Sequence, residues 1–120
     1  DTVNINKKPK TSIAWLNNSN SFESDDFILG RLVVSYENML SSDNYVCVSV
    51  TIMDFDFFNG VLIPNVTITM NQTELNNVDN YYPKVLAIQD YMYTNYTDMF
   101  VLIWLRKYSG IFAAIFDEFG

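Results

Sequence analysis

The stretch of residues 82–105 constrains the fold most, because it is the longest run in the chain rich in β-branched, aromatic and other apolar residues. These residue types favour strands. The stretch predicts two strands, at residues 84–93 and 98–107. The residues between them, 94–97, are Thr-Asn-Tyr-Thr and favour a turn. We therefore expect an antiparallel hairpin, with the rest of the chain arranged about it.

Residues 45–53 give the clearest single strand, because apolar and mostly polar positions alternate along them. A period of two places Val46, Val48, Val50 and Ile52 on one face of a strand. The next apolar run is broken by Asn59-Gly60, a dipeptide that is a strong signal for a β-hairpin.

The pairing of that hairpin predicts an irregularity. A two-residue turn would pair Phe58 with Val61 and set apolar side chains opposite polar ones further along. A shift of one residue corrects the faces and sets Val66 opposite Ile52. The sequence therefore predicts a β-bulge between Asp54 and Pro64.

Shorter apolar segments complete the chain. Residues 12–16 and 27–36 predict strands, and Gly30 inside the second predicts a bulge or a sharp bend. The run at 111–116 fits a final strand or one to two helical turns, and it would be adhesive if nothing covered it.

The predicted fold is an all-β antiparallel domain over residues 11–120, preceded by an arm at residues 1–10. An antiparallel barrel is the first choice and a two-sheet β-sandwich the second. The arm contains three of the seven basic residues and could add as a strand to a partner.

Composition excludes several classes of function. The formal charge of −7 provides no basic surface for nucleic acid. The absence of His and the single Cys47 exclude His-based triads, His metal sites and thiol pairs. The segment with Asp54, Asp56 and Asn59 lacks the spacing of a calcium loop and predicts a solvated turn. We expect no enzymatic activity, no cofactor and no metal.

Four N-x-S/T sequons indicate a secreted glycoprotein. The chain begins at Asp1 without Met, which we interpret as a processed form or a fragment. No apolar run reaches the roughly 18 residues of a membrane span, so membrane insertion is not expected. The predicted glycosylation sites are Asn17, Asn65, Asn71 and Asn95.

Several segments of the later half resemble a lipocalin. In that family a strand with the pattern V-L-x-T-D-Y-x-x-Y precedes a hairpin, an apolar returning strand and a final strand. The resemblance implies an antiparallel barrel around a small apolar ligand. The segments are Val85-Leu86-Ala87-Ile88-Gln89-Asp90-Tyr91, Asn95-Tyr96, Phe100-Val101-Leu102 and Phe112-Ala113-Ala114-Ile115, with a fainter similarity at Ser21-Phe22-Glu23.

Two main functional hypotheses follow. The first is a carrier whose barrel holds a small apolar ligand. The alternative is a structural glycoprotein that forms a homo-oligomer or filament by strand addition, through the N-terminal arm and the apolar C-terminal run. A third hypothesis is a protein partner bound by the Tyr-rich face of Tyr81, Tyr82, Tyr91, Tyr93 and Tyr96. The candidate lining residues of the carrier, which fit a filled core equally well, are Val46, Val48, Val50, Ile52, Val66, Ile68 and Trp104.

Overall fold

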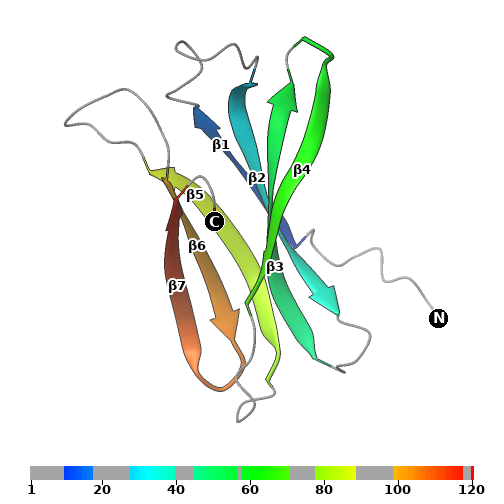
Figure 1. Cartoon of the computed structure of the whole chain (residues 1–120). Coiled ribbons are helices and arrows are strands. Elements are labelled where there is room, and N and C mark those ends of the chain that lie inside the picture. Colours follow the sequence, from blue (N-terminus) through cyan, green and yellow to red (C-terminus); the bar gives the residue numbers. More distant parts are fainter. Residues whose placement is uncertain are drawn as a thin grey trace.

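The computed structural model shows an all-β chain with two antiparallel sheets (Figure 1). It describes residues 10–17, 28–39, 45–56, 58–70, 78–88, 99–117 and 120. Sheet A has the strand order β1-β2-β3-β4 and sheet B the order β5-β6-β7. The strands are β1 (Thr11–Asn17), β2 (Ile28–Met39), β3 (Val46–Asp56), β4 (Val61–Thr69), β5 (Asn80–Ile88), β6 (Met99–Arg106) and β7 (Gly110–Asp117).

The sheets are not closed into a barrel, so the fold preferred from the sequence is wrong; the arrangement is consistent with the second choice, a two-sheet sandwich. Strands β1 and β5 lie close, but they form no backbone ladder. Pro83 of β5 has no N–H to donate, and the register of β5 is irregular between Tyr81 and Lys84. The N–H of Val85 donates to the Ser12 side-chain Oγ at 3.2 Å.

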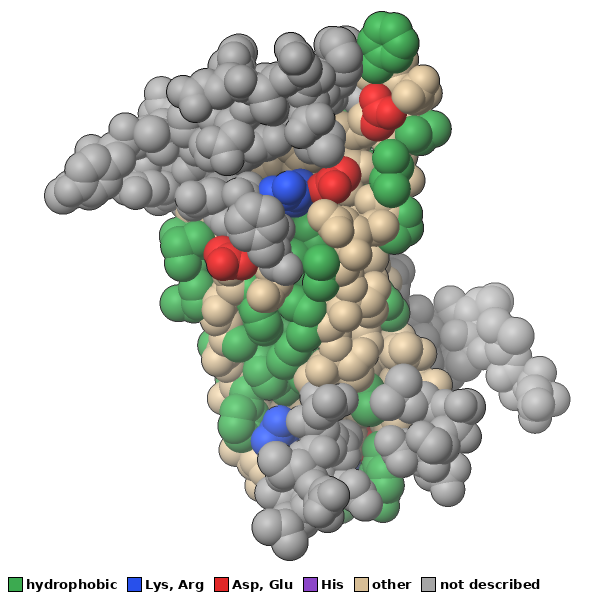
Figure 2. All heavy atoms as spheres, in the orientation of Figure 1, with side chains coloured by type: hydrophobic (Ala, Val, Ile, Leu, Met, Phe, Trp, Pro, Cys, Tyr) green, Lys and Arg blue, Asp and Glu red, His purple; other side chains and the backbone are tan. Residues whose placement is uncertain are grey.

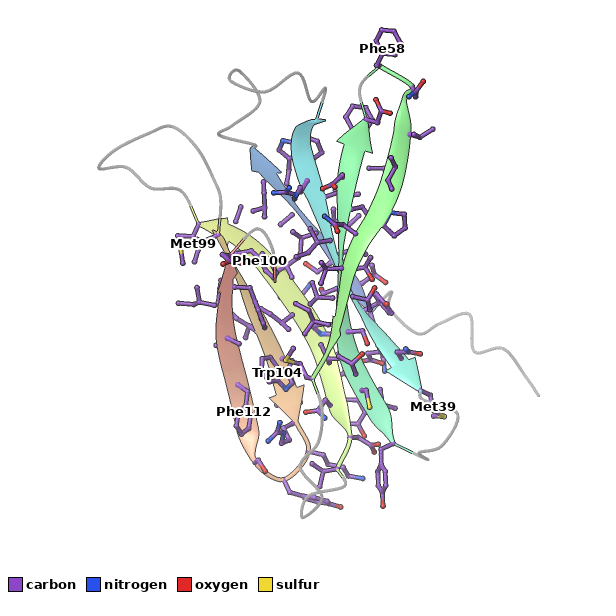
Figure 3. The ribbon with its side chains drawn as sticks, in the orientation of Figure 1. Met39, Phe58, Met99, Phe100, Trp104 and Phe112 are labelled. Atoms are coloured by element: carbon purple, nitrogen blue, oxygen red, sulfur yellow. The ribbon has the colours of Figure 1, made fainter. Side chains whose placement is uncertain are left out.

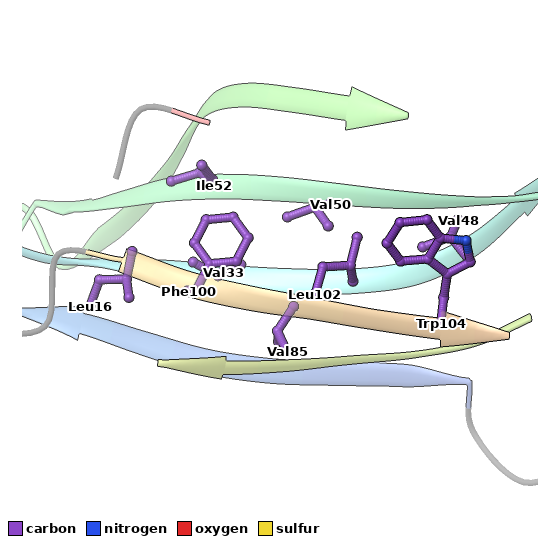
Figure 4. Close-up of a cluster of buried hydrophobic side chains, with 9 residues drawn as sticks. All are labelled: Leu16, Val33, Val48, Val50, Ile52, Val85, Phe100, Leu102 and Trp104. Atoms are coloured by element: carbon purple, nitrogen blue, oxygen red, sulfur yellow. The ribbon is translucent and has the colours of Figure 1, made fainter. Parts of the chain in front are cut away.

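The core lies between the two sheets and is formed mainly by alternate residues of β3 and β6 (Figure 4). The predicted alternation of β3 is confirmed for three residues, because Val48, Val50 and Ile52 are fully buried on its inner face. Each such side chain stabilises the fold by about 1.5–3 kcal/mol through its removal from water. The other members of the cluster are Leu16, Val33, Val85, Phe100, Leu102 and Trp104.

The hairpin of β3 and β4 contains a bulge, but outside the segment predicted for it, and its turn also differs from the prediction. The pairs Ile52↔Val66 and Val50↔Ile68 have the expected register, which then shifts between Val66 and Pro64. The extra residue is Asn65, just beyond the predicted segment. The turn begins from the pair Asp56↔Val61, and not from Phe58↔Val61, because Asp56 caps a longer turn.

The central prediction from residues 82–105 is confirmed as a strand pair. Strand β5 pairs antiparallel with β6, with Val85 opposite Leu102 and Ile88 opposite Met99. The connecting residues 89–98, which include the predicted turn, lie outside the described residues. The C-terminal run forms a strand, β7, which pairs with β6 and settles the choice between strand and helix.

A buried polar group fixes one end of sheet B. The Asn80 side chain is fully buried, and its Oδ1 accepts from Trp104 Nε1 at 3.0 Å and from Arg106 Nε at 3.1 Å. The Arg106 guanidinium also lies over the Phe112 ring, 4.3 Å from its centroid. The indole N–H of Trp104 is thus satisfied inside the core.

Candidate interaction surface

The outer face of sheet A has a polar part and an apolar part. Its apolar part includes Ile13 and Trp15, which are exposed. Thr51 Oγ1 lies 3.1 Å from Tyr36 Oη and 3.0 Å from Thr67 Oγ1. Ser49 and Thr69 form a similar hydroxyl pair at 3.0 Å. Cross-strand hydroxyl pairs of this kind stabilise a sheet, so the polar part of this face has hydrogen-bond partners within the fold.

The outer face of sheet B is apolar on all three strands. Alternation along β6 sends Met99 outward and Phe100 into the core (Figure 3). Three of the outward side chains are more than half exposed: Leu86 at 59%, Ile111 at 77% and Ile115 at 63%. In the register of the sheet the outward apolar residues form adjoining rows: Leu86, Val101 and Ile115; Ile103 and Ala113; Leu105 and Ile111; and Ile88 and Met99.

Charged residues lie only at the margins of this face. Lys84 is on the edge strand β5, and Asp117 is the last residue of β7. In the orientation of Figure 2 this face points to the left, where hydrophobic side chains lie over β7, and hydrophobic side chains also lie along β4 at the right. Single exposed apolar residues are normal, but a contiguous apolar face marks an interaction site or an aggregation hazard.

One edge of sheet A is protected against pairing with another chain. In β4, Pro64 lacks a backbone donor, and the bulge at Asn65 interrupts the ladder. Asn65 is exposed and belongs to a sequon, so a glycan there would stand at this edge. Proline, bulges and bulky groups are the usual ways in which natural sheets block edge pairing.

The edges of β1 and β5 face each other, as the Ser12–Val85 hydrogen bond shows. Strand β5 carries its own obstacles, Pro83 and the irregular register beside it. The closeness of the two strands restricts the access of a partner strand to either edge.

Strand β7 is the remaining edge, and it has none of these protections. Among the described strands it pairs with β6 alone. Its sequence, Gly-Ile-Phe-Ala-Ala-Ile-Phe-Asp, contains no Pro, no Lys and one charge at its last position. Gly120 lies against Val66 and Ile68 of β4. Within the described part of the chain, residues 110–116 of β7 therefore have a neighbouring strand on one side alone, beside the apolar outer face.

The structure places the predicted ligand-lining residues in or beside the core. Val48, Val50, Ile52 and Trp104 pack in the buried cluster between the sheets. Val46, Val66 and Ile68 are half-buried. The small apolar ligand stays a prediction, without the closed barrel that was expected to hold it.

Of the predicted glycosylation sites, the structure describes the side chain of Asn65 alone. It is exposed, and its Nδ2 lies 3.2 Å from Asp54 Oδ2. Asn17 is the last residue of β1, and nothing is described of its side chain; Asn71 and Asn95 lie outside the described residues, as do residues 1–9 of the predicted arm.

The candidate calcium ligands are engaged within the fold. Asp54 Oδ1 accepts from Arg31 Nε at 2.8 Å, in an ion pair that is mostly buried. Asp56 accepts from Asn59 Nδ2 at 2.6 Å and from the backbone N–H groups of Asn59 and Phe58. These hydrogen bonds, the Asn59 side chain foremost, lower the pKa of Asp56 and keep it ionised as a turn cap.

Two of the clustered tyrosines join the sheets. Lys10 Nζ lies 5.6 Å from the Tyr81 ring centroid, 5.0 Å from the Tyr82 ring centroid and 3.2 Å from Glu37 Oε2. Tyr82 adopts a φ of 54° and donates its N–H to Glu37 Oε1 at 2.9 Å. A hydrogen bond to Asp79 raises the pKa of Tyr81 to about 12. The other three, Tyr91, Tyr93 and Tyr96, lie outside the described residues.

The sequence predicted an adhesive C-terminal run, but the apolar outer face that also includes β5 and β6 was missed. Its signal was present, because β6 reads Met-Phe-Val-Leu-Ile-Trp-Leu without alternation. Continuous apolar strands are typical of sheets covered on both faces. That signal suggests a partner for the second face of sheet B.

Comparison with protein-family models, curated proteins and solved structures found no match to this chain. The resemblance to lipocalins stays a prediction. In the described part of the chain, no helix is long and apolar enough to cross a membrane.

Proposed function

We propose that the protein is a secreted, N-glycosylated and non-enzymatic structural subunit that assembles with protein chains through sheet B. Assembly occurs by strand addition at β7, the edge beside the apolar outer face. The observation that carries this proposal is the apolar outer face of three adjacent strands beside an unpaired edge.

Strand addition uses both parts of this surface. The free N–H and C=O groups of β7 supply main-chain hydrogen bonds to an added strand, and alternate side chains supply specificity. Ile111 and Ile115 project from the outer face, and burying each adds about 1.5–3 kcal/mol at most to association.

The sequon at Asn65 agrees with assembly through an edge other than β4. Asn65 lies on β4, the edge strand of the other sheet. A glycan there would block pairing at β4. Assembly would then proceed through one defined edge.

The test is the size of the deglycosylated protein in solution, compared with that of an Ile115→Lys variant. Ile115 is 63% exposed, so Lys fits without disturbing the core. A charge on an edge strand opposes strand addition. We expect the native chain to elute above the 13.9 kDa monomer and the variant to elute as a monomer.

Ile13→Lys is the matched control. Ile13 is 62% exposed, on the outer face of sheet A, and the substitution changes the net charge by the same amount. Each variant is less acidic than the native chain, so charge repulsion cannot explain a loss of assembly in one alone. We expect Ile13→Lys to assemble normally. A monodisperse native monomer, or equal loss in both variants, would contradict the proposal.

A further inference from the structure

The sequence of β7 can pair with itself. An isologous dimer needs a surface patch that is complementary to its own copy. Two β7 edges related by a two-fold axis normal to the sheet run antiparallel, and each face of the sheet continues across the junction. Side chains alternate, so facing residues must be both inward or both outward. Among the registers that pair most of both strands, the two-fold axis can therefore pass only through Ala113 or through Ala114.

The register centred on Ala114 continues the inner aromatic rows. Within one copy, Phe112 stacks on Trp104 with ring centroids 5.9 Å apart, and Phe116 stacks on Phe100 at 5.3 Å. An axis at Ala114 places Phe112 opposite Phe116 of the second copy. Each row then contains four rings, one on each β6 and β7 strand of the two copies, and aromatic cross-strand pairs stabilise sheets.

The register centred on Ala113 is less favourable. It would place Phe112 opposite Ala114 and Phe116 opposite Gly110, so neither ring would meet another across the junction. Phe112 and Phe116 are half-buried in the single chain. Only the axis at Ala114 covers both rings with aromatic partners, while the small Ala114 side chains meet at the axis.

Charge permits a second copy at this edge. Each chain has a formal charge of −7, which opposes association in general. Strand β7 has no charged side chain from Gly110 to Phe116. Two copies can therefore approach along this edge without placing like charges opposite each other.

We propose that the partner of β7 is a second copy of this chain, paired antiparallel about a two-fold axis at Ala114. The inference rests on the proposed function, because it names the partner at the same edge. Pairing of two short strands covers less than a standard interface of roughly 1,600 Å². The dimer is thus reversible, with a dissociation constant in the micromolar range, and an isologous contact closes at two copies.

The test is disulfide trapping in the full chain, with the buried Cys47 replaced by Ala. Ala114→Cys places two thiols on directly opposed residues, whose Cα atoms are about 4.5–5.5 Å apart and within disulfide range. Ala113→Cys places them on diagonal positions more than about 7 Å apart, which a disulfide does not bridge. Under mild oxidation we expect linked dimer for Ala114→Cys and mainly monomer for Ala113→Cys.

The outcomes separate this inference from the function on which it rests. Dominant linkage of Ala113→Cys, or a dimer by size in which neither cysteine links, overturns the Ala114 axis and leaves assembly intact. A native chain that remains a monomer overturns both. A Cys47→Ala parent without the new cysteines must not link, and native-like unfolding of both variants shows that each is folded.

Discussion

At the scale of single residues, Gly30 shows how one missing side chain lets neighbouring strands meet. Gly30 lies on β2, between Asn17 of β1 and Phe55 of β3. A Cβ there would collide with the Trp15 ring and lie 2.6 Å from the Leu16 carbonyl O. The Trp15 side chain crosses this position and packs edge-on against the Phe55 ring, with the two ring centroids 6.2 Å apart. The register shift beside Gly30 confirms the predicted bulge, and the ring contact adds a second reason for glycine.

Gly30→Ala should destabilise the protein by about 1–3 kcal/mol, as expected for a methyl group forced into filled space. The measurement is the free energy of unfolding in denaturant. The same substitution in a Trp15→Ala background should cost less, because the ring is gone and only the carbonyl contact remains. An equal cost in both backgrounds would contradict the role given to Trp15.

At the scale of strands, the sequence predicted elements better than their neighbours in space. Alternation in β3 identified the inner face, because that strand has one apolar and one mostly polar side. Strand β6 is apolar at nearly every position, so its sequence did not indicate which side chains face the core and which face outward. Closure could not be predicted either, since a barrel needs ladders at two seams, between β1 and β5 and between β4 and β7. Neither ladder is present among the described strands, and local patterns do not reveal pairing between strands so far apart in the sequence.

For the candidate surface, too, the sequence predicted the element but not its neighbours in space. The apolar C-terminal run was predicted from composition alone. That β7 is an edge follows only from the order β5-β6-β7. The outer face exists because Leu86, Val101 and Ile115 share one row, and that register is fixed by pairing across 30 residues of chain.

A single residue, Asp79, joins three elements through its carboxylate and its backbone carbonyl. Asp79, just before β5, accepts the Val46 N–H of β3 at 2.9 Å and the Tyr81 hydroxyl at 2.8 Å. The Lys107 N–H, in the β6–β7 turn, donates to the Asp79 carbonyl O at 2.9 Å. The Val46 hydrogen bond, followed by that of Tyr81, lowers the pKa of Asp79.

Because the folded pKa of Asp79 is below the unfolded value of 3.8, its stabilisation is present above that pH and is lost as the pH falls through the folded pKa. Asp79→Asn should reduce the free energy of unfolding at pH 7 by about 1 kcal/mol, allowing for solvent screening. The difference from the native chain should vanish in strong acid. Denaturation of both proteins at several pH values measures this difference in the free energy of unfolding. A difference that persists in acid would contradict the role given to the ionised Asp79 carboxylate.

At the scale of the whole molecule, an acidic chain with an uncharged edge balances two opposed effects. The charge of −7 keeps chains apart over most of their surface. The protections on β4 and the contact of β1 with β5 leave β7 as the edge open to pairing. Association at β7 must therefore overcome the long-range repulsion between charges that lie elsewhere on the two chains. Because salt screens this repulsion, the dissociation constant should depend on ionic strength.

Raising sodium chloride from about 0.01 M to about 0.15 M shortens the Debye length from about 30 Å to about 8 Å. The repulsion between two like-charged copies is then largely screened, and the dissociation constant should fall on the order of tenfold. Sedimentation of the deglycosylated chain at several concentrations measures this change. Ile115→Lys should remain monomeric at both ionic strengths, because screening does not restore an edge blocked by a charged side chain. Dissociation at the higher salt concentration would instead indicate that attraction between charges holds the copies together, and it would remove β7 as the contact.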